Sequence, residues 1–208
     1  MTQTRIAVLV SGGGTNLQAL IDAQEAGELK SGKIVLVIAN KEGAYALERA
    51  ARAGIPALTI TRKACGTQEA FEEALQKALE EAGAELIILA GFLSILSADF
   101  TRRWPERIIN IHPALIPSFC GKGFYGLKVH EAALACGVKV TGATVHFVNE
   151  IPDGGRILLQ KAVEVKEGDT PEILQRRVME EAEWILLPQA AELVAKQINE
   201  KKKGAEHD

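Results

Sequence analysis

The stretch Arg5-Ile6-Ala7-Val8-Leu9-Val10-Ser11-Gly12-Gly13-Gly14-Thr15-Asn16-Leu17 decides the fold, because an apolar run passes through three glycines directly into a helical pattern. The run is typical of a buried strand, and the pattern from Leu17 to Glu25 is typical of a helix. Glycines let the backbone wrap closely round an anion, and the N–H groups at the start of a helix attract negative charge. The stretch predicts a strand, a phosphate loop and a helix; a tight turn without a ligand is the alternative.

The loop differs from a dinucleotide-binding fingerprint in two respects. Leu17 stands where the third glycine of that fingerprint would be, and the next strand ends at residues 38–41 without an acidic residue to hold a ribose. A single phosphate on a smaller ligand therefore fits better than NAD, and NAD is not expected as a cofactor.

The rest of the first half alternates short strands with helices. The unbroken apolar run at residues 85–90 is typical of a central parallel strand covered on both faces. Alternation of this kind implies right-handed βαβ units in a doubly wound sheet, so we expect an α/β fold whose N-terminal half is Rossmann-like. The other expected elements of this half are strands at residues 33–38 and 56–60 and helices at residues 44–53 and 68–82.

The pattern changes after Asn110. A glycine-rich loop at residues 118–126 leads into a helix at 127–136, and two strands follow at 141–148 and 157–165. The turn between these two strands carries Asp153. We expect this pair to add antiparallel strands to the otherwise mostly parallel sheet.

Two helices are expected to close the chain. One begins at about Pro171, with Thr170 as its N-cap, and the other begins at about Pro188. No internal repeat or linker is visible, so the sequence predicts a single domain over residues 1–198. A polar, disordered tail is expected over residues 199–208.

Composition places the chain among ordinary globular proteins. Its 208 residues suit one core, and a formal charge of -3 gives no reason to expect a nucleic-acid partner. No signal peptide is indicated at the N-terminus, and no apolar run approaches the roughly 20 residues of a membrane span. The sequence therefore predicts a cytoplasmic protein with no membrane partner, either a monomer or a homodimer.

Cysteine and histidine spacing argues against disulfides and metals. Cys65, Cys120 and Cys136 are odd in number and show no CxxC spacing, which fits a reducing compartment. The histidines never pair at ligand spacing with each other or with a cysteine, so no metal is expected.

Asn110 and His112 end the apolar run at residues 107–109 and suggest chemistry. An Asn and a His one residue apart at the end of a strand point the same way, so both side chains can converge on one atom. A carboxylate from elsewhere, such as Asp153, could orient and charge the imidazole. These are the parts of an acyl-type transfer site without a serine or cysteine nucleophile. A packed or capping histidine is the alternative.

At this point the chain resembles a known family. Five motifs, in family order over nearly the whole chain, are similar to those of the folate-dependent glycinamide ribonucleotide formyltransferases of purine biosynthesis. The motifs are Ser11–Leu20, Ala90–Leu96, Asn110–Pro117, Gly142–Val148 and Asp153–Gly155.

The resemblance implies transfer of a formyl group from the co-substrate 10-formyltetrahydrofolate to the amine of glycinamide ribonucleotide. It implies a catalytic trio of Asn110, His112 and Asp153, in which Asp153 holds the imidazolium of His112 and raises its pKa. The residues that match nucleotide-binding positions are Gly14, Thr15, Asn16 and Glu183. The residues that match folate-binding positions are Gln68, Leu93, Ser94, Ile95, Leu96, Asn110, Asn149, Glu150, Ile151, Pro152 and Asp153.

The chain departs from the family pattern at several of these positions. Ser94 and Gln68 stand where family members often carry Arg, so a charged ligand contact is open at both. Lys122 and Lys128, in and after the glycine-rich loop, could reach a phosphate or the folate glutamate, or could be solvated lysines. His130 could edge the phosphate site, and His146 could lie behind His112 or be a core residue.

Three other functions remain open at this stage. A formyltetrahydrofolate deformylase would share the Asn-His-Asp trio, although such proteins carry an additional N-terminal domain. Other folate-dependent formyltransferases usually carry additional domains and lack this glycine-Thr-Asn loop. A non-catalytic nucleotide-binding module would explain residues 12–16 but not the trio.

Overall fold

The computed structural model describes residues 3–205, and these residues divide into two compact units. The first unit comprises the chain up to Leu96 together with the residues from Ala191 onward. The second unit comprises Ser97–Ala190. The prediction of one domain over residues 1–198 therefore stays a prediction.

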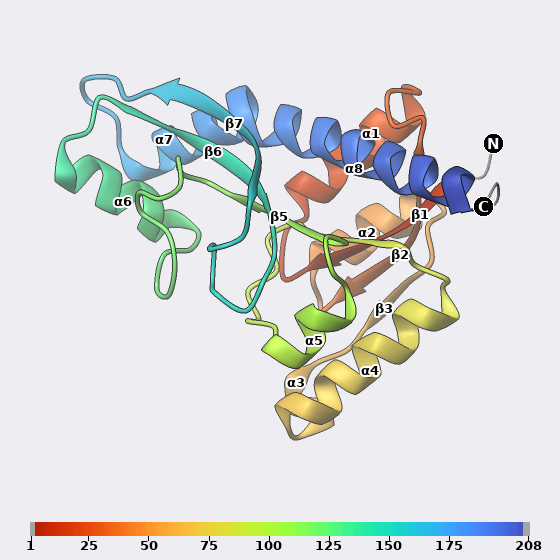
Figure 1. Cartoon of the computed structure of the whole chain (residues 1–208). Coiled ribbons are helices and arrows are strands. Elements are labelled where there is room, and N and C mark those ends of the chain that lie inside the picture. Colours follow the sequence, from red (N-terminus) through yellow and green to blue (C-terminus); the bar gives the residue numbers. More distant parts are fainter. Residues whose placement is uncertain (1–2, 206–208) are drawn as a thin grey trace. The chain divides into compact units, whose positions relative to one another are not determined.

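The first unit is built on parallel strands (Figure 1). Its strands lie in the order β3-β2-β1-β4, so the chain crosses back after β3 to place β4 beside β1. The strands are β1 (Thr4–Val10), β2 (Gly32–Ala39), β3 (Ala57–Thr59) and β4 (Leu86–Leu89). The helices are α1 (Thr15–Glu25), α2 (Tyr45–Arg52), α3 (Arg62–Cys65) and α4 (Gln68–Glu81).

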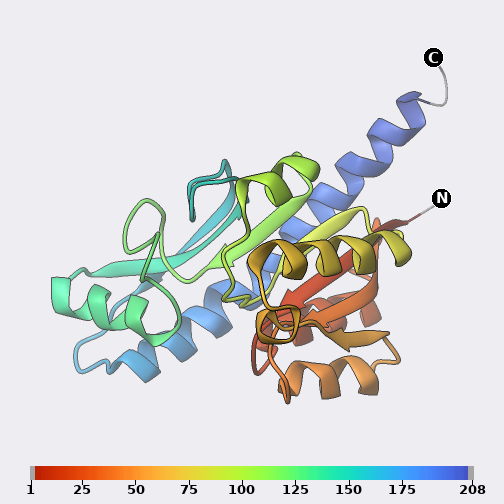
Figure 2. The same ribbon diagram turned by 90° about the horizontal axis from the view of Figure 1, so that it is seen from below.

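Helices cover both faces of these strands, which explains their apolar sequences. Figure 2 shows α2 and α4 on opposite sides of the strands. Residues 6–10 of β1 have no exposed surface. Helix α4 begins at the Thr67 cap, whose hydroxyl accepts from the Ala70 N–H, and it buries Phe71, Leu75 and Leu79 at helical spacing.

The second unit pairs its strands in antiparallel fashion. Strand β6 lies between β5 and β7 and pairs with both. The strands are β5 (Ile108–His112), β6 (Val140–Phe147) and β7 (Ile157–Glu164). The helices are α5 (Ala98–Arg103), α6 (Leu127–Cys136), α7 (Pro171–Val178), a π-helical turn η1 (Met179–Glu183) and the first residues of α8 (Trp184–Ala205).

These pairings confirm the predicted α/β fold, with parallel strands in the first half and antiparallel strands in the second. Helices α3 and α5 were not predicted, because four and six residues are too few to show a helical period. The two predicted closing helices are one continuous run, joined by η1. Pro188 lies inside α8 rather than at its start. Proline has no N–H, so the Trp184 carbonyl does not receive the usual helical hydrogen bond from residue 188.

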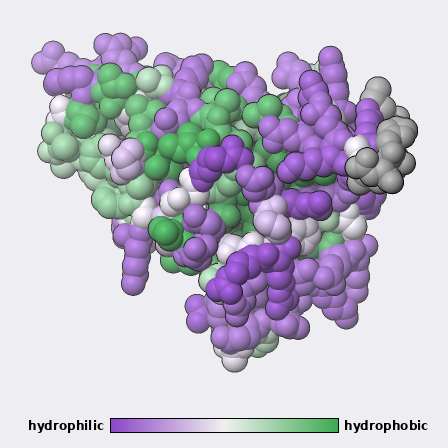
Figure 3. Space-filling model, viewed as in Figure 1, coloured by the Kyte–Doolittle hydropathy of each residue, from purple (hydrophilic) through white to green (hydrophobic). Residues whose placement is uncertain are grey.

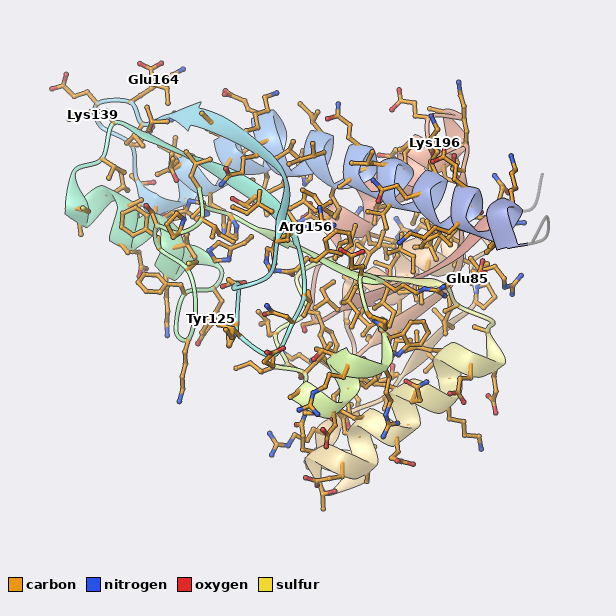
Figure 4. All side chains as sticks on the ribbon, viewed as in Figure 1. Glu85, Tyr125, Lys139, Arg156, Glu164 and Lys196 are labelled. Atoms are coloured by element: carbon orange, nitrogen blue, oxygen red, sulfur yellow. The ribbon has the colours of Figure 1, made fainter. Side chains whose placement is uncertain are left out.

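The prediction of a disordered tail from residue 199 is wrong as far as Ala205, because α8 continues to that residue. The helix is fixed to the first unit by its side chains. The Asn199 amide accepts from the Thr4 hydroxyl at 2.8 Å and donates to the Ser31 carbonyl at 2.8 Å. Lys202 Nζ lies 2.6 Å from a carboxylate oxygen of Glu85, labelled in Figure 4. Residues 206–208 lie outside the described residues.

Apolar side chains also reach the surface of the second unit. Figure 3 shows green surface over this part of the chain, and Val140, Ile157 and Ile173 are 52%, 39% and 49% exposed. Scattered apolar side chains are ordinary on globular proteins, so they support no functional argument alone. Among the described residues, no helix combines the length and the apolar character needed to cross a membrane.

We predict that Asn199→Ala lowers the free energy of unfolding by about 1–3 kcal/mol, because the substitution leaves the buried Thr4 hydroxyl and the Ser31 carbonyl each with one partner fewer. Lys196→Ala, at an exposed position of the same helix labelled in Figure 4, is the matched control and should change stability by less than about 0.5 kcal/mol. Urea unfolding measures both. Equal stability of the two variants would show that the Asn199 hydrogen bonds, which fix the end of α8, contribute nothing to the free energy of unfolding.

Candidate active site

Strand β5 carries both Asn110 and His112. The two residues are two positions apart, so their side chains leave the same face of the strand. Asn110 lies opposite His146 of β6, and His112 lies opposite Thr144. The sequence placed the pair at the end of the strand, and the structure agrees, because β5 and its ladder with β6 end at His112.

His112 is 4% exposed and faces an acceptor at each ring nitrogen. Nε2 lies 2.8 Å from the Phe119 carbonyl oxygen, which can only accept, so Nε2 carries a proton. Nδ1 lies 3.6 Å from an Asp153 carboxylate oxygen. The neutral ring therefore turns an unprotonated nitrogen toward a carboxylate, and a second proton on Nδ1 would complete an ion pair.

The Asp153 carboxylate is shared among several donors. One oxygen faces His112 and also accepts from the Gly121 N–H at 2.8 Å. The other oxygen lies 3.5 Å from His146 Nε2. A single carboxylate from the β6–β7 turn thus connects β5, β6 and the glycine-rich loop.

The turn that presents Asp153 depends on the two glycines after it. Asp153 itself has a φ of 56°, a left-handed conformation that costs a non-glycine residue about 1 kcal/mol or more. A Cβ on Gly155 would lie 1.7 Å from the Phe147 carbonyl oxygen, and one on Gly154 would lie 2.6 Å from a methyl of Ile151. The side-chain amide oxygen of Asn149 accepts from the Ile151 N–H at 3.0 Å and closes the turn from its other end.

His146 fixes the orientation of the Asn110 amide. Its Nδ1 lies 2.7 Å from the Phe147 carbonyl oxygen and must donate to it, so Nε2 of the neutral ring is an acceptor. Nδ2 of Asn110 lies 3.2 Å from this nitrogen. An amide NH₂ group has two hydrogens, so Asn110 can donate a second hydrogen bond to a ligand.

Burial dominates the pKa of His112. Desolvation lowers the pKa below its usual value, while the Asp153 charge and the Phe119 carbonyl raise it by less. The Asp153 charge raises this pKa, as expected, and desolvation makes the net shift downward. Burial raises the pKa of Asp153, but the neighbouring imidazole of His146, the charge of His112 when its ring is protonated and the Gly121 N–H together outweigh burial, so the net pKa is lowered. The resting site therefore holds a neutral imidazole beside a carboxylate.

His130 is a third buried histidine, on α6. It has no exposed surface, and within the described chain neither ring nitrogen has a hydrogen-bond partner. Burial lowers its pKa to about 4, with a smaller contribution from His112. The suggestion that His130 edges the phosphate site is not supported, because the ring is enclosed within the second unit.

The glycine loop of the first unit has the form of an anion site. Gly14 caps α1 with a φ of 71° and no side-chain cap, so backbone N–H groups are left at the start of the helix. Gly12 and Gly13 are exposed, Thr15 is half-buried and Asn16 is 6% exposed.

The segment at residues 93–96 is fastened to the same loop. The Leu93 N–H donates to the Ser11 hydroxyl at 2.8 Å. Ser94 accepts from the Asn40 amide at 2.7 Å, and Gln68 donates to the Ile95 carbonyl at 3.1 Å. Both side chains thus hold the segment itself.

The structure sorts the predicted site residues between the two units. The trio and the turn at residues 149–152 lie in the second unit, as does Glu183, which is 6% exposed in η1. Gly14, Thr15, Asn16, Gln68 and residues 93–96 lie in the first unit. Leu93, Ile95 and Ile151 are 62%, 60% and 58% exposed, and Glu150 and Pro152 are also exposed, so these side chains are free to contact a ligand. Leu96 is 6% exposed and packs inward.

The residue pattern did not predict two backbone groups that contribute to the site. The Phe119 carbonyl and the Gly121 N–H hold His112 and Asp153, but backbone groups leave no signal in a residue pattern.

Of the loop lysines, Lys128 lies 3.2 Å from the hydroxyl of Tyr125, labelled in Figure 4, while Lys122 is exposed. Among the described residues, no three His, Cys, Asp or Glu side chains are arranged to hold a metal ion.

The fold and the shared carboxylate define an α/β enzyme with a buried acid–base site suited to group transfer. Residues 4–190 match the formyl transferase family, and the chain belongs to this family.

Named relatives narrow the comparison. The chain is 41% identical to phosphoribosylglycinamide formyltransferase of Haemophilus influenzae over 85% of this chain and 81% of that protein. It is 48% identical to the chicken (Gallus gallus) trifunctional purine biosynthetic protein adenosine-3 over 93% of this chain, but spans only 18% of that protein. Glycinamide ribonucleotide transformylase 1 from Symbiobacterium toebii superposes with a TM-score of 0.87 at 44% identity, over 94% of this chain and 89% of that one.

We predict that Asp153→Asn lowers the pKa of His112 further below its usual value, because it removes the charge that opposes desolvation. Titration of the His112 ring protons by NMR measures the shift. Asp99→Asn, on the exposed face of α5, is the control and should leave the titration unchanged. A higher His112 pKa in Asp153→Asn would contradict this account.

A second prediction concerns acid stability. The unfolded chain binds a proton on His130 near pH 6.5, whereas the folded chain binds it only near pH 4, so stability is lost as pH falls between these values. A shift of this size corresponds to about 3 kcal/mol at pH 4. Unfolding of His130→Phe should therefore show a smaller stability loss between pH 7 and pH 4 than the parent protein. Parallel curves for the two proteins would exclude His130 as a source of acid sensitivity.

Proposed function

We propose that this chain transfers the formyl group of 10-formyltetrahydrofolate to the amine of glycinamide ribonucleotide. The products would be formylglycinamide ribonucleotide and tetrahydrofolate, in de novo purine (IMP) biosynthesis. The observation that carries the proposal is the constellation of Asn110, His112 and Asp153, in which Asp153 lies beside the buried ring of His112 and His146 contacts both Asn110 and Asp153. The names of the relatives support the same reaction.

Each substrate would contact a different set of the predicted residues. The glycine loop would bind the nucleotide phosphate through Gly14, Thr15 and Asn16, and Glu183 would contact the same substrate. The folate would contact the segment at residues 93–96 and the turn at residues 149–153, with Gln68 behind the first and Asn110 beside the second. We further propose a cytoplasmic monomer or homodimer that binds small molecules rather than nucleic acid or membrane.

The formyl oxygen needs hydrogen-bond donors, because negative charge develops on it when the formyl carbon is attacked. Attack of the amine on the formyl carbon forms a C–N bond and a tetrahedral oxyanion. Nε2–H of His112 already holds a carbonyl oxygen, that of Phe119, so it has the geometry to hold the formyl oxygen once the substrate replaces that contact. The second N–H of Asn110, aimed by His146, would supply another donor.

Proton transfer follows from the lowered pKa of His112. The unprotonated nitrogen of the neutral ring is Nδ1, which faces Asp153, so the proton that the attacking amine loses would reach Nδ1 through an ordered water, and Asp153 would stabilise the resulting imidazolium. The bond from the formyl carbon to the folate nitrogen then breaks, and that nitrogen receives the proton, directly from His112 or through an ordered water. The sequence balances without a covalent enzyme intermediate.

The test is an assay with both substrates and no added metal or ATP. We expect formylglycinamide ribonucleotide and tetrahydrofolate in equal amounts. His112→Ala and Asp153→Asn should each lower kcat about a hundredfold or more, the usual cost of losing a group that stabilises the transition state, while the circular dichroism spectrum is preserved. Lys139→Ala, on an exposed turn labelled in Figure 4, should retain parental kcat.

Two results would oppose the proposal. Release of tetrahydrofolate at the same rate without the nucleotide would identify a deformylase instead. Parental turnover in either trio variant would remove that residue from the mechanism.

A further inference from the structure

Arg49 of α2 is fastened to the glycine loop. Its Nε donates to the Gly13 carbonyl at 2.8 Å, and a terminal guanidinium nitrogen donates to the Gln18 side chain at 2.9 Å. The guanidinium also lies 5.0 Å from the ring centroid of Tyr45. A planar guanidinium held at three points has little rotational freedom, so it also restricts the orientation of the Gly13 carbonyl.

These contacts decide which way the loop's N–H groups point. In a trans peptide the C=O and the following N–H point in opposite directions. The Gly12 carbonyl accepts from the Ala46 N–H at 3.1 Å, so the N–H of Gly13 points away from α2. The Gly13 carbonyl accepts from Arg49, so the N–H of Gly14 also points away from α2. Helix α2 thus orients two successive peptide groups.

A loop of three glycines needs such anchors. Gly12 and Gly13 have no neighbouring atoms that a Cβ would meet, so packing does not restrict them, and glycine has the largest backbone freedom of any residue. Gly14 is restricted, because a Cβ there would lie 2.6 Å from the Cβ of Ala46. Of the peptide groups in this loop, the one between Gly13 and Gly14 is held by a charged side chain.

We infer that Arg49 is a positioning residue for phosphate binding, one that pre-orients the loop amides toward the phosphate of the nucleotide substrate. The inference rests on the proposed function for the identity of that substrate. The guanidinium acts from the carbonyl side of the loop, so it shapes the site without contacting the phosphate. Its effect depends on the fork geometry that reaches Gly13 and Gln18 together, which a lysine cannot reproduce.

The test compares Arg49→Gln, Arg49→Lys and Arg52→Gln. Arg52 is the matched control, because it lies 5.5 Å from the same Tyr45 ring but pairs with Glu48 instead of the loop. Both Arg49 variants should raise KM for glycinamide ribonucleotide about tenfold or more, the effect of losing a charge-assisted hydrogen bond, with kcat and the folate KM unchanged. Arg52→Gln should match the parent protein.

A binding measurement separates this inference from the proposed function. Calorimetric titration with ribose 5-phosphate should show binding to the parent protein and about tenfold weaker binding to Arg49→Gln. Ribose 5-phosphate binding without formyl transfer would overturn the proposed function and leave the Arg49 inference standing. A parental KM in Arg49→Gln, or full recovery in Arg49→Lys, would overturn the inference, as would equal losses of kcat and of folate binding.

Discussion

The architecture of the candidate site depends on one largely enclosed carboxylate, that of Asp153. An isolated ionised carboxylate is costly to bury, so Asp153 requires polar partners, and they come from different parts of the chain. The imidazoles of His112 and His146 stand on adjacent strands, and the Gly121 N–H comes from the loop that follows β5. Each partner is held in place by the same charge that it stabilises. The contacts of Asp153 therefore specify the register of β5 against β6 and the closure of two loops.

The division of labour between strand and loop follows from this constraint. Asn110 and His112 stand on a strand paired along its length, so their positions are fixed by backbone hydrogen bonds. The loops contribute backbone groups and one carboxylate, and two of their residues, Phe119 and Asp153, adopt left-handed φ values of 49° and 56°. Local strain of this kind persists where surrounding contacts determine the conformation, as the shared carboxylate does here.

Much of the fold was predictable because strand and helix periods are local. Ten of the predicted elements, such as the helix at residues 127–136, lie within about two residues of the observed ones. The docked tail was not predictable, since Asn199 meets Ser31 across 168 residues of sequence. In the site, the residue types and their spacing pointed to Asn110, His112 and Asp153. The roles of the Phe119 carbonyl and the Gly121 N–H, and the net fall in the His112 pKa, required coordinates, because backbone contacts and burial are properties of the folded chain.

The composition of the first unit has a consequence for synthesis. Its parallel strands are complete by Leu96, but the part of α8 that fastens Thr4 and Ser31 follows almost a hundred residues later, after the whole second unit. A ribosome delivers the chain from its N-terminus at about 5–20 residues per second. For several seconds the nascent strands β1 and β2 therefore lack the helix that packs on them last, while Asn110, His112 and Asp153 are still being synthesised. The glycine loop of the first unit can therefore form before Asn110, His112 and Asp153 have been synthesised. Helix α8 packs onto the first unit last.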